Sequence, residues 1–150
     1  MNLNWAIKGE LATSSLPTTE ADVARLKRLG FGAVLSLHPV SPGVARLLQD
    51  LGIIQINQEI EDFSTPGLEE MDRLKALLDE WQALGKPILI HCYMGVGRCK
   101  TVACAYLTTR GYTLAEAFDL VGFPETMAQT SFIEQYYHHR AEQSQAVESA

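Results

Sequence analysis

The sequence predicts a single α/β domain in which helices flank a mainly parallel central sheet of four or five strands. First, short apolar runs typical of buried strands alternate with stretches whose apolar residues recur at helical spacing. Second, 150 residues, 47% of them hydrophobic and 20% charged, suffice for one hydrophobic core. Third, the sequence has no internal repeat, low-complexity block or interdomain linker, so we expect one domain over residues 1–150.

The first half of the chain has the pattern of four strands and two helices. Two short extended segments are expected in "NWAIKGELATSS", followed by a helix in "LPTTEADVARLKRLGF" with Thr18 or Thr19 as its N-cap. Three apolar residues of this helix recur at helical spacing: Val23, Leu26 and Leu29. "GAVLSL" is typical of a buried strand, "SPGVARLLQDLG" of a short helix that Gly52 ends, and "IIQINQEI" of a strand.

The second half of the chain is mostly helical in pattern. After the polar loop "EDFSTPG", an amphipathic helix begins at Leu68, and its apolar face from Met71 to Leu84, with Trp81, is expected in the core. The strand "ILIHC" follows. Helices over about 99–110, 113–121 and 127–141 come next, and residues 142–150 are expected to form a frayed tail.

Charge and composition narrow the classes of partner. The net charge of −6 and a pI near 5.1 argue against a broad surface for nucleic acid or anionic membranes. No apolar stretch approaches the roughly 20 residues of a membrane span, and the first residues do not resemble a signal peptide. Three cysteines without a disulfide-framework pattern fit a reducing compartment, so we expect a cytoplasmic protein with free thiols at Cys92, Cys99 and Cys104.

The segment "HCYMGVGRCKT", residues 91–101, joins the last predicted strand to a helix and concentrates polar residues there. A strand-to-helix turn directs several backbone N–H groups into one concavity, which favours an anion. Gly95 and Gly97 permit the necessary backbone conformations, and Arg98 can grip two oxygens of a phosphate. The same positive surroundings lower the pKa of Cys92 and make it a nucleophile at neutral pH.

Two other interpretations of this segment fit less well. A nucleotide-binding phosphate loop needs glycine directly before "KT", and this chain has Cys99 there. A zinc site would have to use four residues without paired C-x-x-C spacing: His91, Cys92, Cys99 and Cys104. We therefore expect no metal site.

"HCYMGVGR" matches the HCxxGxxR signature of the cysteine-based protein tyrosine and dual-specificity phosphatases. The chain resembles the small atypical dual-specificity phosphatases over nearly its whole length, and "NWAIKGELATSSLP" resembles their opening segment. The resemblance implies a protein tyrosine phosphatase-like fold and a metal-independent, two-step reaction without a cofactor. It also implies substrates that are proteins or peptides phosphorylated on tyrosine and, given the small size of the chain, on serine or threonine. The expected oligomeric state is a monomer by default.

The resemblance assigns the nucleophile to Cys92, which would form a cysteinyl phosphate. The loop that binds the phosphate of the substrate comprises Cys92, Tyr93, Met94, Gly95, Val96, Gly97 and Arg98. "IEDFSTPG" resembles the loop that carries the general acid, which places Asp62 in that role with Glu61 adjacent. His91 is expected to support the site through hydrogen bonds.

The segment "GFPETMAQTSFIEQYY" resembles the one whose glutamine orients the hydrolytic water, which implies that role for Gln129, with Glu125 as a second candidate. Cys99 departs from the family, because Ser or Thr usually follows the signature arginine and donates a hydrogen bond to the nucleophile. A thiol is a weaker donor, so we expect slower breakdown of the phosphoenzyme than with a hydroxyl at this position. A disulfide between Cys92 and Cys99 is a further hypothesis. His38 is a second departure, and the sequence assigns it no role.

Three alternatives to a protein phosphatase stay open at this stage. The substrate could be an RNA 5′-phosphate or another non-protein phosphate, although the loop carries no lysine to favour a phosphoinositide. A sulfurtransferase would also use a loop cysteine. A pseudoenzyme that only binds phosphate would keep Arg98 and need neither Cys92 nor Asp62.

Overall fold

The computed structural model describes residues 1–149, and side chains as far as residue 145. Its five strands form one sheet in the order β1-β2-β5-β3-β4. The strand bounds are β1 Leu3–Ile7, β2 Leu11–Ser14, β3 Ala33–Ser36, β4 Ile54–Asn57 and β5 Ile88–His91. Only the β1–β2 pair is antiparallel, and the other three pairs are parallel. The predicted α/β fold with a mainly parallel sheet is confirmed.

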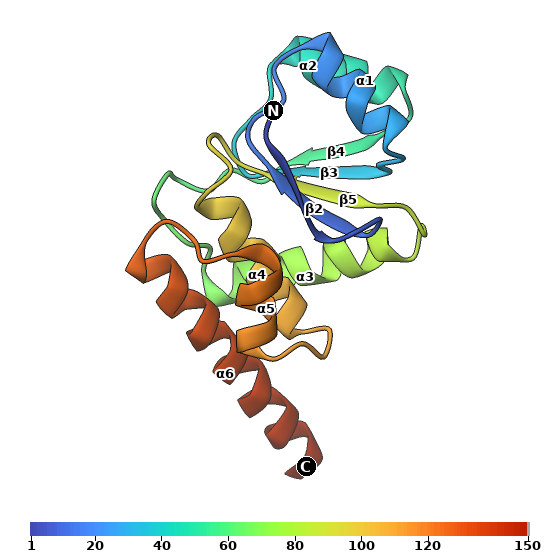
Figure 1. Ribbon diagram of the computed structural model, residues 1–150. Helices are drawn as coiled ribbons and strands as arrows, with labels where there is room; N and C mark the ends of the chain where they lie inside the picture. The colour runs from blue at the N-terminus through green and yellow to red at the C-terminus, as the bar shows by residue number, and fades with distance from the viewer. Residues whose placement is uncertain (150) are drawn as a thin grey trace.

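Helices cover both faces of the sheet (Figure 1). Their bounds are α1 Glu20–Arg28, α2 Pro42–Asp50, α3 Leu68–Gln82, α4 Arg98–Thr108, α5 Leu114–Val121 and α6 Met127–Ser149. The short helices α1 and α2 lie on one face over a small core that includes Val34 and Leu89, and α3 to α6 lie on the other over a larger core. The α4 helix has buried residues along most of its length, so the helix that follows the loop of residues 92–97 is the central helix of the larger layer. Among the described residues, no helix is long and apolar enough to cross a membrane.

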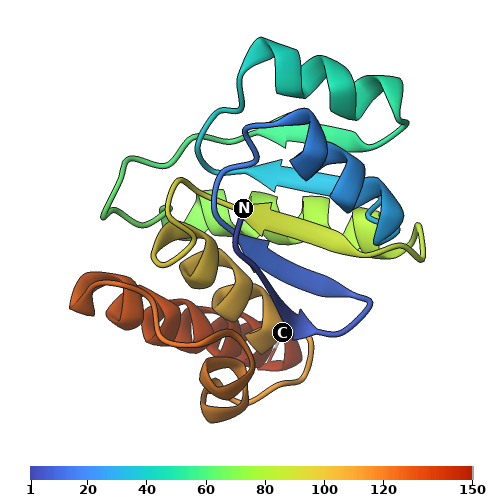
Figure 2. The same ribbon diagram turned by 45° about the horizontal axis from the view of Figure 1, so that its top comes forward.

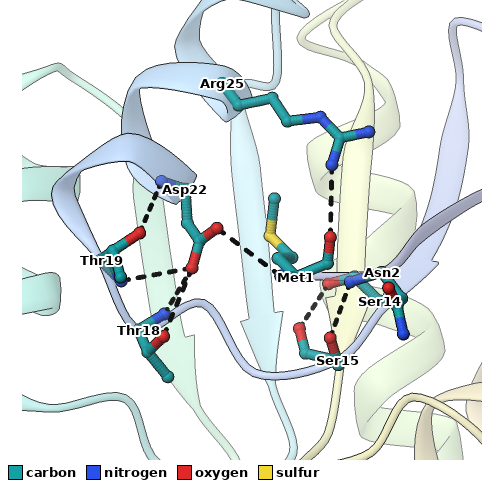
Figure 3. A network of polar contacts seen from close by, with 8 residues as sticks. All are labelled: Met1, Asn2, Ser14, Ser15, Thr18, Thr19, Asp22 and Arg25. Carbon is teal, nitrogen blue, oxygen red and sulfur yellow. Dashed lines mark hydrogen bonds and ion pairs between the residues drawn. The ribbon is translucent and has the colours of Figure 1, made fainter.

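The connection between β2 and α1 is fixed by a polar network (Figure 3). Thr19 is the N-cap of α1: its hydroxyl accepts from the Asp22 N–H, and the Asp22 carboxylate accepts from the N–H groups of Thr18 and Thr19. At the other end of the connection, the Ser15 hydroxyl accepts from the Asn2 N–H at 2.8 Å. This network matters for function because residues 14–16 lie directly behind the cysteine loop, as described below.

Several predicted boundaries differ from the structure. The last helix continues to Ser149 instead of ending at residue 141, because "AEQSQAVES" contains good helix formers and neither glycine nor proline; Ala150 lies outside the described residues. The last strand-like run before the polar loop is shorter than predicted, with β4 limited to Ile54–Asn57. The sequence predicts Leu84 in the core, but this residue lies beyond the end of α3 and is 50% exposed. Leu29, predicted within the first helix, is the C-cap of α1 and is exposed.

The parallel pairing places the carboxyl ends of β2, β3, β4 and β5 at the same edge of the sheet. The loop after β5, the loop between β4 and α3, and the connection from α5 to α6 all reach this side of the molecule in both views (Figures 1 and 2). Ligands of open parallel sheets usually bind at this edge. The candidate site is therefore built from three segments that are far apart in the sequence.

Candidate active site

The loop between β5 and α4, residues 92–97, surrounds the Cys92 thiol, and we call it the cysteine loop. Cys92 is 2% exposed, and the Gly95 N–H donates to its sulfur at 3.3 Å. The loop is held from behind by β2, since the Cys92 N–H donates to Ser14 and the Leu16 N–H donates to the Tyr93 carbonyl. The sulfur is thus held at the carboxyl edge of the sheet, next to the first turn of α4.

Close contacts surround both glycines of the cysteine loop, and those at Gly95 require glycine. Gly95 has a φ of +80°, and a Cβ there would lie 2.7 Å from the Ser15 nitrogen and 2.9 Å from the Ser14 carbonyl carbon. A Cβ on Gly97 would lie 3.1 Å from the side-chain nitrogen of Gln129. The loop therefore packs against β2 on one side and against α6 on the other.

The surroundings of Cys92 stabilise its thiolate. The largest cause is a hydrogen bond from the Cys99 thiol, and backbone N–H groups of the loop add to it; burial opposes them, and the pKa of Cys92 is lowered to about 5. The pKa of the Cys99 thiol is raised, because it donates to the Cys92 sulfur and is itself fully buried. At neutral pH the pair consists of a thiolate at Cys92 and a protonated donor at Cys99. Cys104 is fully buried in α4, as expected for a core residue.

His91 is buried and carries hydrogen bonds on both ring nitrogens. Nδ1 lies 3.0 Å from the Cys92 carbonyl oxygen, and Nε2 lies 2.6 Å from the Ser36 hydroxyl. Burial is the main reason that the pKa of His91 is lowered to about 4. A neutral ring has one donor, and the carbonyl can only accept, so Nδ1 donates and Nε2 accepts from Ser36. Gln55 in turn donates to the Ser36 hydroxyl at 2.9 Å, which extends the support across β3 and β4.

Arg98 is the first residue of α4, as the sequence predicts, and its side chain is only 4% exposed. Its Nη1 donates to the Ile60 carbonyl at 2.8 Å, and its Nη2 lies 3.6 Å from the Asp62 carboxylate. The Nε–H is buried and has no hydrogen-bond partner among the described residues. A buried guanidinium with a free donor, next to a helix N-terminus, is suited to an oxyanion.

Asp62 lies on the loop between β4 and α3, residues 58–67, which we call the acid loop. Its carboxylate accepts from the Phe63 N–H at 3.0 Å and faces Arg98, while about half of the side chain remains exposed. Phe63 has a φ of +63°, which a bulky residue rarely adopts and which costs about 1–3 kcal/mol. The strained residue bends the chain directly after Asp62, at the point where the carboxylate meets Arg98.

Gln129 joins the acid loop to α6. It is fully buried, its side-chain nitrogen donates to the Ser64 carbonyl at 3.3 Å, and its side-chain oxygen accepts from the Thr126 N–H at 3.0 Å. The Thr126 hydroxyl in turn accepts from the Gln129 N–H, so the two residues form a capping box. The structure therefore brings the four predicted catalytic residues together: Cys92, Arg98, Asp62 and Gln129. Glu125, the second candidate, is exposed, although its Cβ approaches Gly97.

A cleft of about 580 Å³ opens beside these residues. Its lining comprises His38, Glu59, Ile60, Glu61, Asp62, Tyr93 and Arg98. The sequence alone predicts no role for His38 and does not indicate that Ser36 and Gln55 support His91. Two signals were present: a serine that ends the buried run "AVLS", and a histidine two residues later, both at the carboxyl end of a central strand.

The sheet order, the cysteine loop and the acid loop together define an α/β domain of the protein tyrosine phosphatase type. The PTP-SAK family, described as Swiss Army Knife protein, DSP-PTPase phosphatase domain, matches residues 1–149, and the chain belongs to this family. A curated relative, dual specificity protein phosphatase Mpk3 of Drosophila melanogaster, is 30% identical over 105 residues. That match covers 69% of this chain and 25% of Mpk3, so the chain spans about a quarter of the relative's length.

Solved structures of phosphatases have the same fold. A mutant form of Tk-PTP superposes with a TM-score of 0.82 at 28% identity, covering 93% of this chain and 97% of Tk-PTP. PTPMT1 superposes with a TM-score of 0.80 at 15% identity, covering 97% of this chain and 99% of its own. Human DUSP28 superposes with a TM-score of 0.73 at 22% identity, covering 97% of this chain and 99% of DUSP28. Because PTPMT1 and DUSP28 share so few identical residues with this chain, their likeness to it concerns the fold alone.

Proposed function

We propose that this protein is a metal-independent phosphatase that hydrolyses phosphotyrosine, and also phosphoserine and phosphothreonine, in proteins through a cysteinyl-phosphate intermediate. The observation that carries the proposal is the pairing of a stabilised thiolate at Cys92 with the free, buried donor of Arg98. Both flank one helix N-terminus, where backbone N–H groups add to the positive potential. Such a site binds a phosphate dianion and places a nucleophile beside its phosphorus.

In the first step, the Cys92 sulfur attacks phosphorus and the bond from phosphorus to the leaving oxygen breaks. Arg98 and the N–H groups of the cysteine loop stabilise the charge on the three equatorial oxygens. Asp62, whose carboxyl group lies beside Arg98 at the edge of the cleft, gives its proton to the leaving oxygen. The products of this step are the dephosphorylated hydroxyl group and a phosphorylated Cys92.

In the second step, water attacks the cysteinyl phosphate, the phosphorus–sulfur bond breaks and inorganic phosphate is released. The Asp62 carboxylate takes the proton from water, and Gln129, which lies against Gly97 and the acid loop, orients the water molecule. The thiol of Cys99 stabilises the departing Cys92 thiolate. His91 serves as a positioning residue, because its hydrogen bonds tie the Cys92 carbonyl to β3.

Turnover of a small aryl phosphate in the presence of a chelator tests the proposal. Wild type is expected to hydrolyse it at an undiminished rate, whereas Cys92→Ser and Arg98→Ala lose roughly three orders of magnitude or more in kcat. Cys104→Ser, a change of the same type in the core of α4, controls for loss of a thiol. Transfer of sulfur from thiosulfate without phosphate release would identify a sulfurtransferase, and phosphate binding without turnover a pseudoenzyme.

A further inference from the structure

The cleft beside Arg98 is lined by two kinds of side chain. One wall is aromatic: the rings of His38 and Tyr93 lie 5.2 Å apart, with their planes tilted by 57°. Apart from Arg98, the other polar lining residues come from the acid loop and are acidic, and we call Glu59, Glu61 and Asp62 the acidic rim. The side chains of the aromatic wall and of Glu59 have no part in the reaction steps proposed above.

Main-chain hydrogen bonds fix the backbone that carries both rings of the aromatic wall. Leu37, directly before His38, donates to the His91 carbonyl and accepts from the Ile60 N–H, each at 3.0 Å. The Tyr93 carbonyl accepts from the Leu16 N–H at 2.9 Å. The Tyr93 side chain nevertheless remains 52% exposed, so a large part of its ring can contact a ligand. The wall is thus an aromatic surface that is open to the cleft and is carried by well-anchored backbone.

The position of the wall determines which part of a substrate it meets. Tyr93 directly follows the nucleophile, and His38 and Arg98 line the same cleft, so the group that carries the phosphate has to leave the cysteine loop along these rings. A flat aryl group packs against aromatic rings and gains more than a short alkyl group does. The acidic rim repels any further phosphate groups of a substrate.

We propose that His38 and Tyr93 are specificity-determining residues that select phosphate esters of an aromatic ring, and that the acidic rim rejects substrates with additional phosphates. This inference rests on the proposed phosphatase function and refines its substrate class. The preferred substrate is a phosphotyrosine peptide. A phosphoinositide or a 5′-phosphorylated RNA is disfavoured, since each presents several negative charges and no aryl ester.

The test compares kcat/KM on two peptides that differ only in phosphotyrosine or phosphoserine. His38→Ala and Tyr93→Ala are expected to lower the tyrosine-to-serine ratio about three- to tenfold, mainly through KM for the tyrosine peptide. Tyr93→Phe keeps the ring and is expected to keep the ratio. The chain offers a matched control, because Tyr137 and His138 form a second ring pair, 5.5 Å apart, on α6. Their alanine variants are expected to leave the ratio unchanged.

The acidic rim is tested with Glu59→Gln combined with Glu61→Gln, assayed on a phosphoinositide and a 5′-phosphorylated RNA. The double variant is expected to raise kcat/KM several-fold on both, and the gain is expected to shrink at high salt. An unchanged tyrosine-to-serine ratio in both alanine variants overturns the inference. A wild type that prefers the phosphoinositide or the RNA overturns it as well. In either case the proposed phosphatase function stands. If wild type hydrolyses no phosphate ester at all, the proposed function falls and the inference falls with it.

Discussion

The side-chain amide of Gln129 donates to the main-chain carbonyl of Ser64, at 3.3 Å, and so links the start of α6 to the acid loop. The same amide lies against Gly97, where a Cβ would approach it to 3.1 Å. One fully buried side chain therefore contacts both the segment that carries Asp62 and the loop that carries Cys92. This contact explains how the acid loop is held beside the nucleophile.

Gln129→Ala is expected to slow hydrolysis of the cysteinyl phosphate more than its formation, because the variant loses the group that we propose orients water. It should also lower the free energy of unfolding by about 1–3 kcal/mol, since two part-buried hydrogen bonds, to the Ser64 carbonyl and from the Thr126 N–H, are lost. A burst of leaving group in rapid-mixing kinetics, with chemical denaturation alongside, measures both effects. Gln135→Ala, at an exposed position of α6, is the control. Equal slowing of both steps would contradict the assignment to water.

The pH dependence of kcat/KM is expected to report the Cys92 thiolate. Because the pKa of Cys92 is lowered to about 5, the nucleophile is charged above that pH, and activity should fall as the pH drops through it. Cys99→Ala removes the main cause of the lowered pKa, so the acid limb should move to higher pH. Cys99→Ser restores a hydroxyl donor, should keep the limb low and should speed phosphoenzyme breakdown. An acid limb that is identical in all three proteins would contradict the role of Cys99.

Asp62→Ala is expected to slow turnover most for substrates with poor leaving groups and to flatten the basic limb of the pH profile. The reason is that a good leaving group departs without a proton, whereas an alkoxide does not. The leaving-group dependence of kcat/KM over a series of aryl phosphates measures the effect. Glu61→Ala is the matched control at the neighbouring position of the acid loop. If Glu61→Ala gives the loss and Asp62→Ala is silent, the general acid is Glu61.

Gly95→Ala is expected to reduce activity by two orders of magnitude or more. The new Cβ would collide with the main chain of residues 14 and 15, at 2.7–2.9 Å, and push the cysteine loop away from β2. Gly9→Ala is an instructive control, because Gly9 has nearly the same φ, +78°, but no atom within 4 Å of the new Cβ. It should cost about 1 kcal/mol of stability through φ alone and leave activity unaffected. Equal activity losses in both variants would show that the collision is irrelevant.

Local sequence patterns were enough to predict most of the fold and the core of the site. Cys92 and Arg98 lie within one short segment, so their spacing alone indicates an anion site at a strand-to-helix turn. Gln129 is different. Helical periodicity indicates that it lies at the start of a helix, but its burial depends on Ser64, which is 65 positions away in the sequence.

The aromatic wall and the hydrogen-bond partners of His91 could not be predicted for the same reason. His38 meets Tyr93, and Ser36 meets His91, only because β3 pairs with β5 in parallel. Strand order is a property of the whole chain and leaves no local signal in the sequence. The extended α6 was missed for the opposite reason, since local helix propensity was underweighted relative to the expectation that termini fray.

Identification of the phosphorylated residue tests the central claim most directly. Gln129→Ala, mixed with an aryl phosphate and quenched after one turnover, is expected to carry one phosphoryl group on the peptide that contains Cys92, detected by mass spectrometry before and after alkylation of free thiols. The same experiment on Gln129→Ala combined with Cys92→Ser, which removes the thiol, should yield no phosphorylated cysteine. Rapid release of phosphate without any phosphorylated Cys92 peptide at any quench time would contradict the account, because hydrolysis would then proceed without the covalent intermediate.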